Sequence, residues 1–106
     1  MIVKGGTELI ADERMRQMLQ EGWTLDHDDG HSSCELSTAA ACYAVYGTGV
    51  TVRGGPGQNT YDDAWPWSHQ WDKRKKHDRL RRLVIAGALI AAEIDRELRL
   101  RDRRKT

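Results

Sequence analysis

The first helical pattern of the chain runs through residues 7–21. Its apolar stripe consists of Leu9, Met15, Met18 and Leu19. Residues three or four apart lie on one face of a helix, so this spacing predicts a helix with that face in the core. Thr7 is suited to cap its start and Gly22 to end it. A second face holds Glu13, Gln17 and Glu21 at intervals of four. We expect that face to be a solvated edge or to face the acidic stretch described below.

The second helical pattern covers residues 34–46 and contains the alanine-rich run A-A-A-C-Y-A. Ser32 and Glu35 have the spacing of a capping box, in which each side chain satisfies a free N–H at the start of a helix. Small side chains allow a neighbouring helix to approach closely. The sequence therefore predicts that this helix packs between the other two.

The third and longest pattern covers residues 78–103. Its apolar positions are spaced by four and three residues in alternation: Leu80, Val84, Gly87, Ala91, Ile94 and Leu98. This spacing predicts a long helix with that stripe buried. A glycine inside a helix costs up to about 1 kcal/mol relative to alanine. We therefore expect Gly87 to permit close contact with the alanine-rich second helix.

The stretch between the second and third helices, residues 47–70, is the least regular, with five glycines and both prolines. Residues 50–52 have the character of a short strand, and the glycine-rich residues after them favour a turn. We predict a small β-hairpin or irregular excursion here. The chain as a whole is predicted to be a mainly α, three-helix domain, with all of residues 1–106 in one domain.

The sequence also bears on the cellular compartment in which such a domain is expected. The longest apolar run, residues 83–92, has about half of the roughly 20 residues that a membrane span needs, and the start of the chain lacks a signal-peptide pattern. Cys34 and Cys42 lie too far apart on one helix for a disulfide. We therefore predict no membrane association and a cytoplasmic location. With no Phe and 39% apolar residues, the core is thin, which favours a homo-oligomer with the third helix as its seam.

Charge is divided unevenly along the chain. Residues 1–52 carry three basic and eight acidic side chains, a net charge of −5, whereas residues 53–106 carry fourteen and eight, a net charge of +6. Such a chain can hold a cation at one end and an anion at the other, or can pair its two halves.

The stretch H-D-D-x-H between the first two helices holds most of the side chains suited to a metal ion. The candidate ligands are His27, Asp28, Asp29, His31, Glu35 and, from the third helix, Glu93. Carboxylates suit Mg²⁺ and Mn²⁺, and imidazoles shift the preference toward Mn²⁺ or Zn²⁺. A histidine, or Glu35, would then act as general base beside a metal-bound water, which makes His31 and Glu35 the catalytic candidates. The alternative is that these groups cap helix ends and pair with the basic third helix.

Tryptophans and basic residues follow one another in the second half of the chain. Trp65, Trp67 and Trp71 fall within seven residues, and Trp23 follows the first helix. A basic run comes next, from which we single out Arg79 and Arg82. Aromatic rings beside cations indicate a surface for a nucleotide base and its phosphates. The alternative is a tryptophan lid packed on the helices, beside a solvated basic surface.

Three segments resemble a group of small proteins of bacteriophages and prophages. They are E-G-W-T-L-D-H-D-D-G-H-S-S-C-E-L-S-T-A-A-A-C-Y-A, then W-P-W, then R-R-L-V-I-A-G-A-L-I-A-A-E-I-D-R, and together they cover most of residues 13–96. The group supplies no settled activity, and this chain has Cys34 where the resemblance leads us to expect a glycine. The resemblance to phage proteins implies that the protein is located in the cytoplasm of the host cell.

A second likeness is to all-α nucleotide pyrophosphohydrolases of MazG type, which hold Mg²⁺ over a triphosphate with paired acidic residues. It would match Glu35 with Glu93 or Asp95. Their E-x-x-E and E-x-x-D pairs are absent from this chain.

Three functions follow from these patterns. The first is a phage-type accessory protein that binds an anionic nucleotide or a host factor, for example to sequester a signalling nucleotide or to inhibit a host defence protein. The alternative is a divalent-metal-dependent nucleotide phosphohydrolase that uses the H-D-D-x-H stretch with Glu35 and Glu93. The third is a nucleic-acid-associated protein that uses the basic third helix; the acidic first half of the chain disfavours it.

Overall fold

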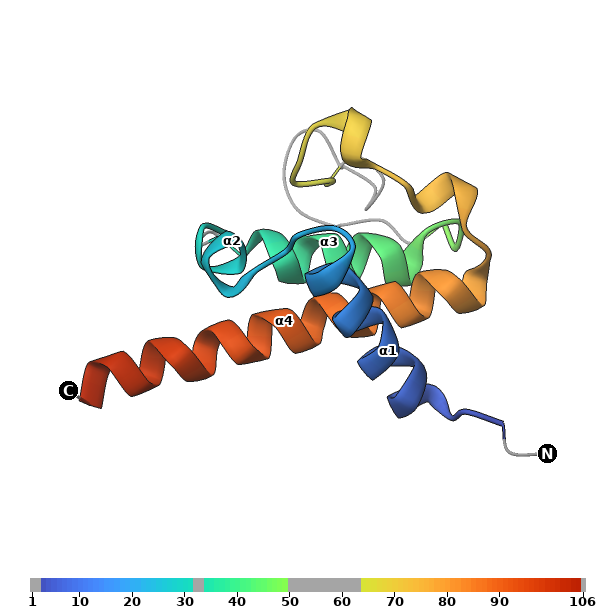
Figure 1. Cartoon of the computed structure of the whole chain (residues 1–106). Coiled ribbons are helices and arrows are strands. Elements are labelled where there is room, and N and C mark those ends of the chain that lie inside the picture. Colours follow the sequence, from blue (N-terminus) through green and yellow to red (C-terminus); the bar gives the residue numbers. More distant parts are fainter. Residues whose placement is uncertain (1–2, 32–33, 50–63, 106) are drawn as a thin grey trace.

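The computed structural model describes residues 3–31, 34–49 and 64–105 (Figure 1). Its elements, in chain order, are α1 (Gly6–Leu19), α2 (Leu25–Asp29), α3 (Glu35–Val45), the 3₁₀ turns η1 (His69–Trp71) and η2 (Arg74–Lys76), and α4 (Arg79–Lys105). The prediction of a mainly α fold is confirmed, and the described residues contain no strand. The strand expected at residues 50–52 lies outside the described residues.

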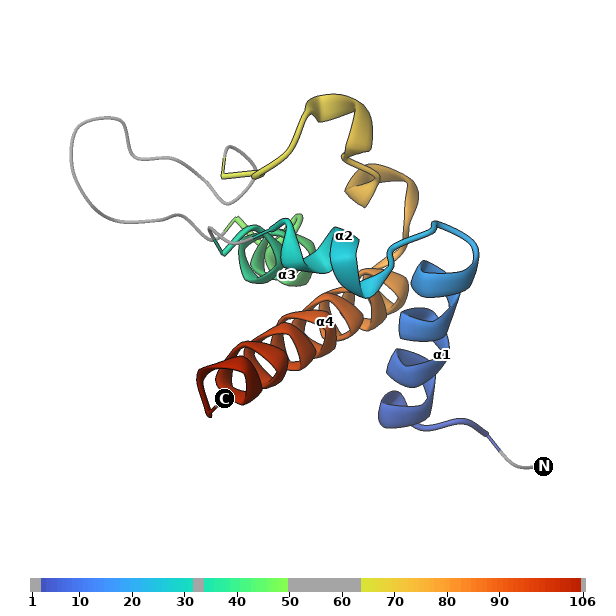
Figure 2. The same cartoon turned by 60° about the vertical axis from the view of Figure 1, so that its left-hand side comes forward.

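Helix α4 is the element on which the others pack. It contacts α3, α1 and α2, and its contact with α3 is the most extensive. Both views show α3 beside the first half of α4, α1 crossing α4, and the segment before α4 arching over α3 (Figures 1 and 2). The prediction that the alanine-rich helix lies between the other two is therefore wrong: α4 has that place because it is apolar on more than one face.

The core lies between α3 and α4. Its buried members are Leu36, Ala39, Ala40 and Tyr43 from α3, and Ile85, Ala86, Leu89 and Ala92 from α4. Four of these eight are alanines, so the two helices can approach closely, as expected for the alanine-rich run. Trp23, Trp65 and Trp67 pack against the same cluster and are partly buried. Tryptophan thus extends a core that has no phenylalanine.

The predicted buried stripe of α4 is confirmed for Val84, which is buried, and is wrong for three of its six members. Leu80, Ile94 and Leu98 are exposed, and the side chains that enter the core are Ile85, Leu89 and their neighbours. Gly87 is also placed differently from the prediction. A Cβ built there would lie 2.7 Å from Cγ1 of Ile10. The glycine therefore admits α1, and not α3, against α4.

Helix α1 begins at Gly6 with Gly5 as its N-cap, so Thr7 is not the cap. Its predicted apolar stripe does not form the buried face, since Met15 and Leu19 are exposed. The buried residues are Glu13, Arg14 and Gln17. This reversal is possible because the buried charges find partners on α2 and α4, as described below.

The stretch between the first two predicted helices contains the short helix α2. The Thr24 hydroxyl caps it by accepting a hydrogen bond from the His27 N–H at 3.2 Å, and two aspartates in its first turn suit the helix dipole. The capping box predicted for α3 involves Ser32, which lies outside the described residues. The N-cap of α3 is Cys34, with φ of 66° in the left-handed region that favours glycine.

Cys34 is exposed and Cys42 is buried, and the two are not joined by a disulfide. Among the described residues no helix is both long enough and apolar enough to cross a membrane.

Candidate functional site

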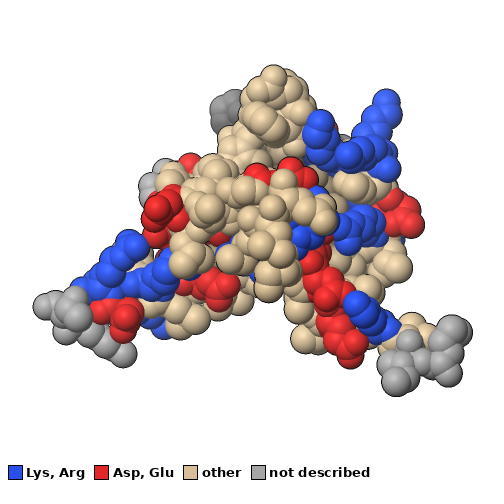
Figure 3. All heavy atoms as spheres, viewed as in Figure 1, with Lys and Arg blue, Asp and Glu red and all other residues tan. Residues whose placement is uncertain are grey.

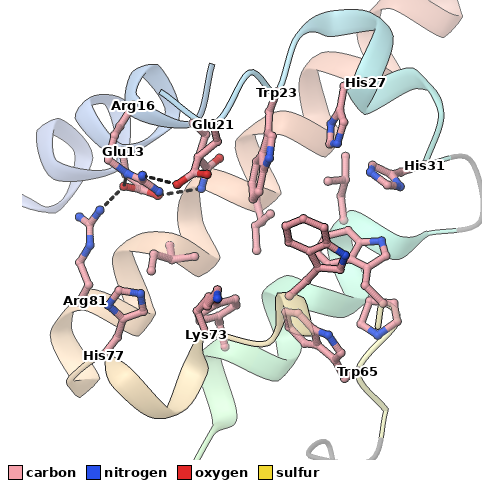
Figure 4. Close-up of a pocket in the computed structure, with 18 of the residues that line it drawn as sticks. Glu13, Arg16, Glu21, Trp23, His27, His31, Trp65, Lys73, His77 and Arg81 are labelled. Carbon is pink, nitrogen blue, oxygen red and sulfur yellow. Dashed lines mark hydrogen bonds and ion pairs between the residues drawn. The ribbon is translucent and has the colours of Figure 1, made fainter. Parts of the chain in front are cut away.

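A cavity of about 950 Å³ lies between the arch formed by residues 64–77, the C-terminal half of α1, the segment around α2 and the core face of α3 and α4. Its walls combine four tryptophans, three histidines and several charged groups. The lining residues used below are Glu13, Arg16, Gln17, Glu21, Trp23, His27, His31, Tyr43, Trp65, Trp67, Trp71, Lys73, Lys76, His77 and Arg81. Figure 4 shows Trp23, His27 and His31 on one side of this space and Trp65 and Lys73 on the other. The volume is within the range of small-molecule sites.

Six rings form a continuous series around part of the cavity, which we call the aromatic wall: Trp23, His27, His31, Trp67, Trp65 and Tyr43. Trp23 and His27 are stacked, with ring centroids 5.8 Å apart and an angle of 8° between planes. The other four neighbouring pairs meet at steeper angles, with centroids 4.8 to 5.8 Å apart. The wall joins α2, α3 and the arch, so tertiary packing alone assembles it.

Arg74 fixes the arch over α3. Its guanidinium lies 4.9 Å from the ring centre of Trp65 and 5.3 Å from that of Tyr46, which is cation–π geometry. It also donates two hydrogen bonds to Asp72, at 2.8 and 2.7 Å, and these bonds lower the pKa of the Asp72 carboxyl. The buried arginine thus holds the arch in the position that forms one side of the cavity.

The cations around the cavity differ in their partners. Arg16 is bound to Glu13 and Glu21, and Arg81 is bound to Glu13, as the dashed lines in Figure 4 show. Lys73 and Lys76, in contrast, make no ion pair within the described residues. Figure 3 shows Lys and Arg gathered over η2 at the upper right, with uncharged surface beside them. Two ammonium groups are therefore available to an anion.

Glu13 is the acceptor at the centre of the charged end of the cavity. Its side chain is fully buried and accepts from Arg16 at 2.7 and 2.9 Å, from Gln17 at 2.9 Å, and from Arg81. Burial opposes ionisation of this carboxyl, but the hydrogen bonds from Arg16 and Gln17 outweigh burial and lower its pKa. Glu13 is therefore an anion that ties α1 to α4.

Three titratable rings in the cavity are held in their neutral forms. Burial, together with the neighbouring His27, lowers the pKa of His31. Burial, with Lys76 and Arg81 nearby, lowers the pKa of His77. Burial raises the pKa of Tyr43 to about 12. At neutral pH His31 and Tyr43 of the aromatic wall, and His77 elsewhere in the lining, are therefore uncharged.

The structure brings together all four tryptophans predicted as ligand-binding residues, since each lines the cavity. The two predicted arginines are not part of its lining. Arg82 lies over the Tyr46 ring and donates to the His77 carbonyl, and Arg79 is exposed at the start of α4. Three of the cations that line the cavity, Lys73, Lys76 and Arg81, come from the same basic run. The two lysines are the N-cap and the last residue of the 3₁₀ turn η2, whose conformation the sequence pattern did not indicate.

The structure does not bring the predicted metal ligands together. Asp28 is buried and paired with Arg14 at 3.0 Å. Asp29 accepts from Arg99 at 2.7 Å and Arg103 at 2.8 Å, and both arginines lower its pKa. Glu93 is paired with Arg96 at 2.7 Å. Among the described residues no group of three His, Cys, Asp or Glu side chains is placed to hold a metal ion.

The remaining metal and catalytic candidates have other positions. His27 and His31 belong to the aromatic wall, and Glu35 opens α3. The arginines are the physical reason why the ligands do not converge. Asp28 and Asp29 each have a guanidinium partner, on α1 and α4 respectively, so the repulsion between these two carboxylates is relieved without a cation. Pairing with the basic last helix was the alternative left open by the sequence, and it holds for Asp29.

Comparison of the chain with protein-family models, with curated proteins and with solved structures gives no match.

Proposed function

We propose that this protein binds a nucleotide in the cavity, with the base against Trp71 and the aromatic wall and the phosphates at Lys73 and Lys76. The observation that carries the proposal is the meeting of neutral aromatic rings and two unpaired ammonium groups in one cavity. A nucleotide joins a planar, uncharged ring system to a compact anion, so it complements both parts at once.

Base stacking on aromatic side chains contributes about 1 to 3 kcal/mol per base. Trp71 is suited to this contact because it lines the cavity while 61% of its surface is exposed. A ring with so little packing of its own is accessible to a ligand. Trp65 and Trp67 are partly engaged by the core and shape the cavity floor.

The anion site depends on the turn η2. In a 3₁₀ turn, side chains three residues apart lie on the same side, and Lys73 and Lys76 have this spacing. Lys75 lies between them in sequence, is exposed, and does not line the cavity. The two lysines can thus approach one phosphate group together.

The pairing of both cavity carboxylates with Arg16 favours binding without turnover. The two carboxylates that line the cavity, Glu13 and Glu21, are both engaged by Arg16, so neither is poised as a general base. Together with the resemblance to phage proteins, this leads us to propose that the protein sequesters a nucleotide. A counter-defence factor that removes a host signalling nucleotide would act in this way.

The test is a titration with nucleotides, nucleosides and inorganic phosphate, followed by tryptophan fluorescence and calorimetry. We expect nucleotides to bind more tightly than either part alone. Trp71→Ala is expected to weaken nucleotide binding about tenfold or more, given the stacking contribution. Lys73→Ala and Lys76→Ala should each weaken it, whereas Lys75→Ala, the matched control, should not.

Two outcomes would contradict the proposal. One is the absence of binding by any nucleotide in the panel. The other is binding that loses as much affinity in Lys75→Ala as in Lys73→Ala, because that pattern indicates general attraction to a basic surface. Release of phosphate during the titration would favour the hydrolase instead.

A further inference from the structure

Helix α4 carries a second apolar face that the fold leaves exposed. Ile90, Ile94 and Leu98 are 42%, 54% and 57% exposed. Ile94 follows the core residue Ile85 by nine positions, which is about 180° of rotation around a helix of 3.6 residues per turn. The exposed residues therefore lie opposite the face that packs on α3. A helix that is apolar on opposite faces is typical of one buried on both.

The spacing along this face is that of a coiled-coil seam. Ala91, Ile94 and Leu98 continue the alternation of three and four that begins at Leu80. Glu93, Ile94, Glu97, Leu98 and Arg101 lie side by side along this part of the helix. Four of these, at positions 94, 97, 98 and 101, have the spacing of the residues that surround a knob in knobs-into-holes packing.

Charge along the same face changes sign over a short distance. Glu97 is half exposed, and its nearest basic partner, Arg96, is 3.9 Å away. Arg101 is exposed and makes no ion pair within the part of the chain that the structure describes. An antiparallel copy of the helix would set the acidic part of one face against the basic part of the other. A parallel copy would set like charges side by side.

We infer that α4 is the interface of a homodimer, in which two copies of this face pack antiparallel, with Leu98 of each placed between residues 94, 97, 98 and 101 of the other. The face is self-complementary in charge, as a two-fold interface requires. Residues 90–101 span about 17 Å, which is short for a stable interface, so we expect the dimer to form only at high protein concentration. This inference is independent of the proposed function, because the cavity lies on the other side of α4.

The test is sedimentation equilibrium of the full chain over a micromolar to millimolar range. We expect a monomer–dimer equilibrium that Ile94→Glu weakens at least about tenfold, because a carboxylate without a partner is strongly disfavoured in an apolar interface. The matched control is Met15→Glu on α1, where the wild-type residue has the same 54% exposure. Thermal melting checks that both variants remain folded, as exposed positions should.

Charge reversal tests the orientation. Glu97→Arg alone and Arg101→Glu alone should each weaken self-association, and a mixture of the two variants should restore it as a heterodimer. An ion pair within one helix cannot be restored by mixing. A chain that stays monomeric throughout, or a dimer weakened equally by Met15→Glu, overturns the inference. A mixture that associates no better than its parts overturns the antiparallel arrangement.

Discussion

Glu13 offers the sharpest test of the structure, because a fully buried carboxylate holds the charged end of the cavity together. Removing one partner of a buried ion pair costs about 3 to 5 kcal/mol. Arg16 and Arg81, however, keep side-chain exposures of 34% and 38%, so both can regain water when the carboxylate is lost. We therefore expect Glu13→Ala to lower the free energy of unfolding by about 2 to 3 kcal/mol. Glu13→Gln, which keeps the shape and an acceptor, should lower it by about 1 to 2 kcal/mol.

The pH dependence follows from the direction of the Glu13 pKa shift. The folded-state pKa is lowered from the ordinary value of 4.5. The stabilisation from the ionised form is therefore complete above about pH 4.5, and it is lost as the pH falls through the lower, folded-state pKa. The stability difference between the wild type and Glu13→Gln should shrink over that acidic range.

The assay is urea unfolding followed by circular dichroism at about pH 7 and about pH 3. Glu8→Gln is the control, because Glu8 is an exposed carboxylate in the first turn of the same helix; surface changes of this kind fall within about 0.5 kcal/mol. If Glu13→Ala changes stability no more than Glu8→Gln does, α1 does not turn its polar face inward, and the reasoning about the cavity's charged end is refuted.

Three further predictions follow from single contacts. Gly87→Ala should destabilise the protein by about 1 to 2 kcal/mol through overlap with Ile10. In an Ile10→Ala background the same change should stabilise the helix by up to about 1 kcal/mol. A double-mutant cycle measured by urea unfolding that lacks this change of sign contradicts the α1–α4 contact. At Cys34, where φ is positive, the Gly variant should be at least as stable as the wild type. The Val variant should be about 1 to 2 kcal/mol less stable than the Gly variant in thermal melting. Equal melting of both variants would be evidence against the left-handed cap. Because burial lowers the pKa of His31 and His77, both gain charge only below their ordinary pH range. Calorimetry with a nucleotide phosphodiester of constant charge should therefore show tighter binding at about pH 5.5 than at about pH 7.5. Equal or weaker binding in acid contradicts this prediction.

Local patterns predicted the helices and much of the aromatic part of the site. The three long helices begin and end near the expected residues because caps, glycines and apolar spacing act over a few residues. All four tryptophans singled out from the sequence line the cavity, since few positions on a small protein can accommodate so many large rings. The short helix α2 was missed, although Thr24 and two aspartates in its first turn are the signal that could have found it.

The inward face of each helix could not be predicted in the same way. Met15 and Leu19 suggested an apolar inner face for α1, but Glu13 and Gln17 are buried instead. The acidic stretch shows the same limit: its pattern left open whether a metal or basic side chains balance its charges, and arginines of α1 and α4 pair with Asp28 and Asp29.

The sequence by itself determined where this chain is helical, where it is aromatic and how its charge is divided, because these properties depend on neighbours along the chain. Only the tertiary structure decided which faces are buried and which charges remain unpaired. Arg81 reaches Glu13 across 68 positions, and Arg99 reaches Asp29 across 70. Burying a carboxylate is favourable only once such a partner is in place, and no pattern within one helix specifies that partner.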